Sequence, residues 1–158
     1  MLRIDHIVFP VWDVPASLAF YTGVMGFKLV ASHTGSDWGG HPWLMMVFDV
    51  GDGRELVLVH LKGSKVPSPD GLARDVRHFA FAVESIAALD GWRDRLAAAD
   101  VDYWEEDHGD QQSVYFEDPN GVVLEITAPP SQPGQQSHDA LDVVHRWIAP
   151  EGGEAPAG

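Results

Sequence analysis

Alternating apolar and polar residues predict eight short β-strands, and apolar residues three and four positions apart predict three helices. The predicted helices cover residues 14–25, 86–99 and 138–148. The predicted strands cover residues 4–11, 27–31, 43–50, 54–61, 77–83, 101–105, 113–117 and 122–127. A strand, a helix and three further strands therefore follow one another twice along the chain.

Proline and glycine mark the segments between these elements. Residues 35–42 are rich in glycine and predict a long loop. Pro67, Pro69 and Gly71 interrupt the apolar pattern and predict a linker between the two units. The expected organisation is a single domain over residues 1–130, made of module one (1–66), a linker (67–76) and module two (77–130), followed by a linker, a helix and a disordered tail over 131–158.

The two units match in sequence at their first strands. Residues 4–9 align with residues 76–81, which places His6 over His78. Each histidine opens an apolar strand that leads into a helical stretch. Strand–helix openings are common, so this match alone is weak evidence of a repeat. A second match is needed before an internal duplication is predicted.

The second match lies in the later strands. Residues 48–53 align with residues 116–121, where a phenylalanine and a glycine coincide. Extending this alignment places Val57 opposite Glu125. The two matches together predict an internal duplication, with two histidines and one glutamate on strands that can face each other.

Composition excludes several classes of function. The 158 residues include 24 acidic and 10 basic side chains, a formal charge of −14, so nucleic acid and anionic membrane surfaces are not expected partners. The absence of cysteine excludes disulfides, zinc–thiolate sites and cysteine nucleophiles. No apolar run is long enough to span a membrane, and the amino terminus does not resemble a signal peptide. We therefore expect a cytoplasmic protein that acts on a small molecule.

Two imidazoles and one carboxylate form the ligand set of a facial triad, which holds a divalent metal and leaves positions open for substrate. Strand alternation puts His78 on the face of Ala80 and Ala82, whose small side chains leave room for a ligand. Glu125 lies within an apolar strand, where a buried carboxylate is costly unless it is paired or bound to metal. The alternative is that these are ordinary polar residues at strand starts and at a sheet edge.

These motifs resemble the vicinal oxygen chelate superfamily, which includes glyoxalase I, extradiol dioxygenases, and fosfomycin- and bleomycin-resistance proteins. The resemblance covers about residues 1–130. It implies an α+β fold in which paired βαβββ modules form a cupped mixed sheet around a metal site; the sequence adds a C-terminal helix. It also implies metal ligands at His6, His78 and Glu125, and a homodimer whose groove walls are shared between subunits.

The fourth ligand position separates the branches of this superfamily. Glyoxalase I enzymes carry a glutamate where the internal alignment puts Val57, and valine cannot bind metal. Glu55 lies two residues away on the same strand face, so a shifted register makes it a possible fourth ligand. Otherwise Glu55 is a charge at a hairpin edge. A three-ligand site fits dioxygenases and fosfomycin-type transferases better than glyoxalase I.

A further pattern, running from His108 to Glu125, is similar to the extradiol dioxygenase signature, with one departure at Glu106. By that resemblance Tyr115 hydrogen-bonds the metal-bound substrate and His108 assists with protons. The alternative is structural, since residues 118–121 form a good turn by themselves and Tyr115 suits a strand.

The possible substrate pocket includes two tryptophans and one valine. Trp38 lies within the predicted glycine-rich loop, and this loop, together with Trp43 just after it, could gate the pocket or stack on an aromatic substrate. Val57 would face the pocket in place of a fourth ligand. The loop can equally be only a hairpin connection.

The reaction expected first is extradiol ring cleavage of a catechol-like substrate, with Fe(II) favoured and Mn(II), Zn(II) or Ni(II) possible. One alternative is a non-redox metal enzyme: a lyase, an isomerase, an epimerase or a thiol transferase. Another is a bleomycin-resistance-like protein that sequesters a cationic drug, which the charge of −14 favours. A third is a metal kept only as a structural clip.

Overall fold

The computed structural model describes residues 4–131 and 139–148, and its strands form two four-stranded mixed sheets. The first sheet has the strand order β1-β4-β3-β2, with β1 parallel to β4 and the other pairs antiparallel. Module one contains β1 (His6–Pro10), α1 (Val14–Ala19), η1 (Phe20–Val24), β2 (Lys28–Trp38), β3 (His41–Gly51) and β4 (Arg54–Leu61).

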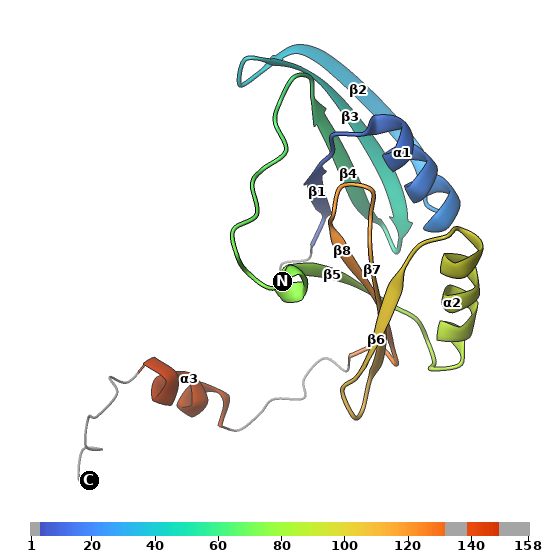
Figure 1. Ribbon diagram of the computed structural model, residues 1–158, viewed down its shortest axis with the longest axis vertical. Coiled ribbons are helices and arrows are strands. Elements are labelled where there is room, and N and C mark those ends of the chain that lie inside the picture. Colours follow the sequence, from blue (N-terminus) through green and yellow to red (C-terminus); the bar gives the residue numbers. More distant parts are fainter. Residues whose placement is uncertain (1–3, 132–138, 149–158) are drawn as a thin grey trace.

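The second sheet repeats this arrangement with the order β5-β8-β7-β6. Helices α1 and α2 lie on the same side of the molecule, one beside each sheet (Figure 1). The α+β fold and the paired βαβββ modules are therefore confirmed. Module two contains β5 (His78–Ala82), α2 (Ala88–Ala98), β6 (Tyr103–Asp107), β7 (Gln112–Glu117) and β8 (Val123–Ala128), and the short 3₁₀ helix η2 (Arg74–Val76) precedes it in the segment between the modules.

The sheet register confirms the alignment of Val57 with Glu125. Val57 lies beside the residue two places after His6, because β1 and β4 pair Val8 with Val57. Glu125 lies beside the residue two places after His78, because β5 and β8 pair in the same way. The two residues therefore hold equivalent positions in the two modules.

Both sheets turn their helix-facing side chains into one hydrophobic core. Phe9 of β1 and Phe79 of β5 meet there with ring centroids 4.4 Å apart. Leu124 and Ile126 of β8 are fully buried in this core. Since side chains alternate along a strand, Glu125 points to the other face of the sheet.

A buried polar contact joins the modules. The Tyr21 hydroxyl donates to Oδ2 of Asp118 over 3.0 Å, and both residues are buried. Burial, together with the charge and hydrogen bonding of Asp118, raises the pKa of Tyr21 well above its usual range. Asn120 adds a second link, since its side chain accepts from the Trp12 amide and donates to Ser17. The turn at 118–121 thus fixes module two against the start of α1.

The predicted long loop at residues 35–42 is wrong. β2 continues to Trp38 and β3 begins at His41, so only Gly39 and Gly40 form the turn. Both have positive φ, 61° and 88°, which glycine adopts without steric cost and which a two-residue hairpin turn requires. The glycines therefore close a hairpin rather than open a loop.

The helix predicted over residues 14–25 is a short α-helix followed by one π-turn, because the Met25 amide bonds to the carbonyl of Phe20, five residues back.

The predicted C-terminal helix is present as α3 (Ala140–Ile148), which buries no residue and lies apart from the two modules (Figure 1). The tail over residues 151–158, expected to be disordered, lies outside the described part of the chain. Within residues 4–131 and 139–148, no helix has the length and apolarity that a membrane span requires.

Candidate metal centre

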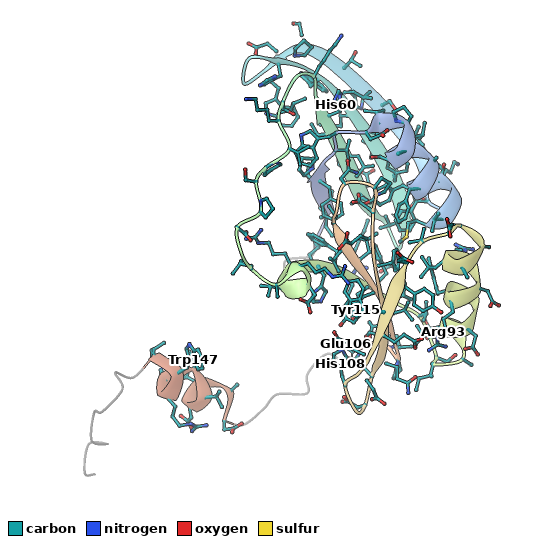
Figure 2. The ribbon with its side chains drawn as sticks, viewed as in Figure 1. His60, Arg93, Glu106, His108, Tyr115 and Trp147 are labelled. Carbon is teal, nitrogen blue, oxygen red and sulfur yellow. The ribbon has the colours of Figure 1, made fainter. Side chains whose placement is uncertain are left out.

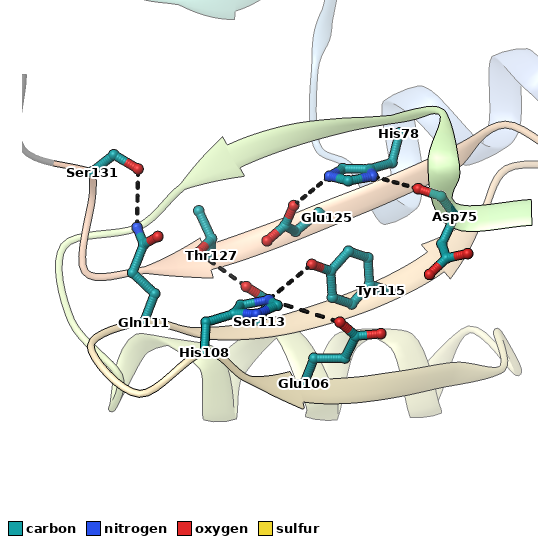
Figure 3. Close-up of polar contacts among 10 residues, drawn as sticks. All are labelled: Asp75, His78, Glu106, His108, Gln111, Ser113, Tyr115, Glu125, Thr127 and Ser131. Carbon is teal, nitrogen blue, oxygen red and sulfur yellow. Dashed lines mark hydrogen bonds and ion pairs between the residues drawn. The ribbon is translucent and has the colours of Figure 1, made fainter. Parts of the chain in front are cut away.

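One face of the second sheet, turned away from α2, carries a band of polar side chains that we term the polar face. Leu124 and Ile126 point into the core, so alternation turns Glu125 and Thr127 to the opposite side. The register brings Glu125 directly beside Tyr115, as the turn between β7 and β8 predicts. The polar face comprises His78, Ser113, Tyr115, Glu125 and Thr127, drawn in Figure 3.

His78 and Glu125 are in direct contact. Nε2 of His78 lies 3.0 Å from Oε2 of Glu125, and the glutamate is only 6% exposed. Nδ1 of the same ring donates to the carbonyl oxygen of Asp75 over 2.6 Å (Figure 3). Because a carbonyl only accepts, the Nδ1 proton is committed to it, and neutral His78 then directs a lone pair at the carboxylate. Two acceptors at this distance need a proton or a cation between them.

This arrangement fits two ligands of a divalent metal. Imidazole nitrogen and carboxylate oxygen are common partners of such ions. The bond from Nδ1 of His78 to a main-chain carbonyl is the outer contact that usually orients a ligating histidine. A cation held between His78 and Glu125 would also offset the cost of burying the carboxylate.

Tyr115 connects this pair to His108. The Tyr115 hydroxyl and Nε2 of His108 are joined by a hydrogen bond of 3.1 Å, and Oε2 of Glu106 lies 3.8 Å from the same nitrogen (Figure 3). Burial, and then the charge and hydrogen bonding of Glu125, raise the pKa of Tyr115 to about 12. Tyr115 therefore stays protonated at neutral pH and can donate to a bound oxygen. Figure 2 shows Tyr115, Glu106 and His108 grouped together, whereas His60 lies at the far end of β4.

Other residues at this face were missed by the sequence analysis. Ser113 donates to Thr127 over 3.0 Å, and both are buried beside Tyr115 and Glu125. Each lies two residues from a predicted site residue on its own strand, so strand alternation is a signal that could have identified them.

Arg74 was also missed, and no local pattern predicts its position. Its guanidinium lies 4.1 Å from the centre of the Trp104 ring, and Nη1 donates to Glu117 over 3.1 Å. Trp104 in turn stacks on Tyr115, with ring centroids 5.3 Å apart. The segment between the modules is therefore anchored next to the polar face by a cation–π contact and an ion pair.

His6 does not join His78 and Glu125 within the chain. In the described ranges, 4–131 and 139–148, no group of three or more histidine, aspartate or glutamate residues is arranged to hold a metal ion. His6 is exposed and its Nδ1 donates to the adjacent Asp5 over 2.9 Å. Glu55 lies directly beside His6 across β1 and β4, at the position equivalent to Val123 rather than to Glu125.

Trp38 and Trp43 lie at the tip of the β2–β3 hairpin. Their rings meet edge to face with centroids 5.8 Å apart. Trp43 packs closely on Gly35, where an added Cβ would come within 2.3 Å of the indole nitrogen. Gly35 is therefore required by the close approach of the ring.

Sequence comparison finds a family match and a curated relative. A model of the Glyoxalase/Bleomycin resistance protein/Dioxygenase superfamily matches residues 3–126. The metallothiol transferase FosB of Lysinibacillus sphaericus (strain C3-41) is 32% identical over 126 residues, which cover 78% of this chain and 79% of that protein.

Solved structures share the fold at lower identity. A glyoxylase/bleomycin resistance protein/dioxygenase domain from Frankia sp. EAN1pec has a TM-score of 0.65 and 23% identity, covering 82% of this chain and 99% of its own. A mutant of the fosfomycin resistance protein FosX from Listeria monocytogenes, complexed with Mn(II) and 1S,2S-dihydroxypropylphosphonic acid, has a TM-score of 0.60 and 18% identity, covering 82% and 94%. Glyoxalase I of Leishmania major has a TM-score of 0.61 and 22% identity, covering 80% and 86%.

Proposed function

Because the chain belongs to the Glyoxalase/Bleomycin resistance protein/Dioxygenase superfamily, we propose that it is a divalent-metal-dependent enzyme that transfers a thiol to a small electrophile. The observation that carries the proposal is the contact of 3.0 Å between His78 and Glu125. The thiol-transfer chemistry is supported by the 32% identity to a metallothiol transferase. This alternative is preferred to the ring cleavage expected first from the sequence.

The third ligand is proposed to be His6 of a second copy of the chain. His6 opens an edge strand of the first sheet and is exposed, so it is free to reach another molecule. Its place in module one is equivalent to that of His78 in module two. A homodimer with two-fold symmetry would bring module one of each copy against module two of the other and complete two equivalent sites.

A divalent ion such as Mn(II), Zn(II), Ni(II) or Fe(II) would act there as a Lewis acid that polarises a carbon–oxygen bond of the substrate. His78 and Glu125 would hold the ion, and the Asp75 carbonyl orients the His78 ring. The Tyr115 phenol would donate a hydrogen bond to the substrate oxygen that gains negative charge as the carbon–sulfur bond forms and the carbon–oxygen bond breaks. His108, 3.1 Å from that hydroxyl, can exchange a proton with it.

The proposal is tested with protein that has been stripped of metal and reloaded with Mn(II). Fosfomycin is offered with cysteine or glutathione, and the loss of free thiol is followed with a chromogenic disulfide. Metal-dependent thiol loss that disappears in His78→Ala but persists in His60→Gln would support thiol transfer. The His60 variant is the matched control because this histidine lies away from the polar face (Figure 2). If no divalent metal supports thiol loss with fosfomycin or with another small epoxide, the thiol-transfer proposal is rejected.

Ring cleavage is the second candidate, and the contact between His108 and Tyr115 favours it. The sequence pattern from His108 to Glu125 predicts these two side chains as a proton-handling pair, and they are hydrogen-bonded to each other. Ring cleavage is tested by measuring oxygen uptake by the Fe(II)-loaded protein with catechol. Oxygen uptake with a yellow ring-cleaved product, and no thiol loss, would favour ring cleavage over thiol transfer.

A further inference from the structure

Helix α3 carries an apolar face that is exposed to solvent over its whole length. Leu141, Val144, Trp147 and Ile148 recur three and four residues apart, so they share one side of the helix. Each of these four side chains is more than half exposed, and Trp147 is 88% exposed. Figure 2 marks Trp147 on this helix, away from both modules. The apolar face is therefore well defined and has no cover in this arrangement of the described residues.

A helix of this length needs a surface to pack against. α3 has nine residues, and an isolated helix shorter than about 12–15 residues is only marginally stable in water. In proteins most of the stability of a helix comes from packing of its apolar face. The exposed face of α3 therefore indicates that the helix folds against an apolar surface.

A cavity of about 560 Å³ between the two modules offers such a surface. Its lining is mainly apolar and includes the buried core residues Phe9 and Ile126. Phe81 of β5 and Trp92 of α2, both half-buried, complete its aromatic lining on the side of module two. It opens to solvent beside Ile4, which is 66% exposed. The cavity lies on the side of the second sheet opposite to the polar face, because side chains alternate along β8.

The chain leaves β8 next to this cavity. Ile126 and Val83 line it, and the Val83 amide donates to the carbonyl oxygen of Thr127 over 2.9 Å. Ser131 is five residues beyond Ile126, so the two lie no more than about 18 Å apart at the length of an extended chain. Asp139 is eight residues further along, and eight residues can span about 26–29 Å. The connection is therefore long enough to return α3 to the cavity of its own chain.

Charge also favours contact between α3 and this part of the chain. Glu55 is exposed at the mouth of the cavity. Arg146 lies in the last turn of α3, beside the apolar face, and can meet this carboxylate when the apolar face packs inward. The chain as a whole has a formal charge of −14, so a basic side chain at the end of the helix is attracted to the modules.

We propose that α3 docks its apolar face over the cavity between the modules of its own chain, with the Trp147 side chain entering the cavity. The docked helix clamps module one to module two, because residues of both modules line the cavity. The contact needs no metal and no substrate. It is therefore independent of the proposed function.

Hydrogen exchange measured by mass spectrometry on the metal-free full chain tests the docking. The amides of residues 140–148 should exchange about 10-fold or more slowly in the parent chain than in Trp147→Ser, because burial of one large apolar side chain favours docking by at least about this factor. Ile4→Asp leaves the sequence of α3 unchanged but places a charge where docking would bury it, so exchange should approach the rate in Trp147→Ser. Val66→Asp is the matched control, since Val66 is 64% exposed and lies in the segment between the modules; it should keep the protection of the parent chain.

Two results would overturn the docking itself. One is rapid exchange of residues 140–148 in the parent chain, at the rate found in Trp147→Ser. The other is an equal loss of protection in Ile4→Asp and Val66→Asp, because the cavity would then have no special part in holding α3.

A mixture of variants separates docking within one chain from exchange of α3 between two copies. Ile4→Asp and Trp147→Ser are unfolded together and refolded at equal amounts. Docking within one chain leaves the peptide that contains Trp147 as unprotected as in Ile4→Asp alone, because that chain carries the altered cavity. Restored protection of this peptide would show that α3 docks on a second copy, and would overturn docking within the chain.

Discussion

The imidazole of His78 donates from Nδ1 to the carbonyl oxygen of Asp75, three residues earlier in the chain, over 2.6 Å. The neighbouring Arg74 anchors the same short turn by its contacts with Trp104 and Glu117. The orientation of the candidate metal ligand therefore depends on a segment that lies between the two modules.

Replacing Arg74 by alanine should weaken metal binding without removing a ligand. Without the Arg74 contacts, the turn would hold the Asp75 carbonyl less firmly. Loss of a contact that directly orients a ligand typically lowers metal affinity by about 10-fold or more. Because Arg74 acts only through the turn, its removal should lower the metal affinity by less than this. Arg74→Lys should rescue binding only in part, because lysine cannot stack as a planar guanidinium does. The free Mn(II) signal in electron paramagnetic resonance measures the affinity. Arg54→Ala, which removes an exposed ion pair with Asp52, is the control, and an equal loss there would contradict this role of Arg74.

Tyr115 should ionise near pH 12 in a titration of phenolate absorbance. Its pKa is raised above the ordinary value of 10.0 by burial and by Glu125. The stability gained from keeping the phenol protonated is therefore present below about pH 10 and is lost as the pH rises through about 12. Tyr115→Phe should abolish the step near pH 12. Glu125→Gln should move it to lower pH, because one negative charge is removed while burial persists; an unmoved step would show that Glu125 has no influence.

Tyr21→Phe should destabilise the contact between the modules. The substitution removes the donor to the buried carboxylate of Asp118, and a lost hydrogen bond to a charged group costs about 1.5–3 kcal/mol. Asp118 keeps its main-chain donors at Asn120 and Val122, so the lower end of this range is expected. Urea denaturation at one fixed protein concentration measures the change. Tyr103→Phe, at a tyrosine that is 37% exposed, should change stability by less than about 0.5 kcal/mol; equal effects would refute the role of the Tyr21 contact.

Strand alternation and internal repetition predicted much of this arrangement. Both can be read directly from the residue order, so the pairing of Tyr115 with Glu125 and the equivalence of Val57 and Glu125 follow from the sequence. The position of Arg74 over Trp104 depends on how a long segment folds back, which no periodicity encodes. The glycines at residues 39–40 form a tight hairpin turn rather than the predicted loop, because glycine favours both structures.

His6 shows a different limit of prediction. Its alignment with His78 is visible in the sequence, but its proposed ligand partners lie on another molecule. Under the proposed arrangement a single chain does not contain the complete ligand set. The proposed metal site therefore requires a dimer.

Mixing two inactive variants tests that dependence most directly. His6→Ala and His78→Ala are each expected to bind no metal, because every site in either homodimer lacks one ligand. After the two are unfolded together and refolded at equal amounts, half of the dimers should be mixed, and each mixed dimer regains one complete site. Metal analysis should then find about one Mn(II) per four chains, against one per chain in the parent protein. A mixture that binds no metal, while the parent chain does, would contradict a site shared between two copies.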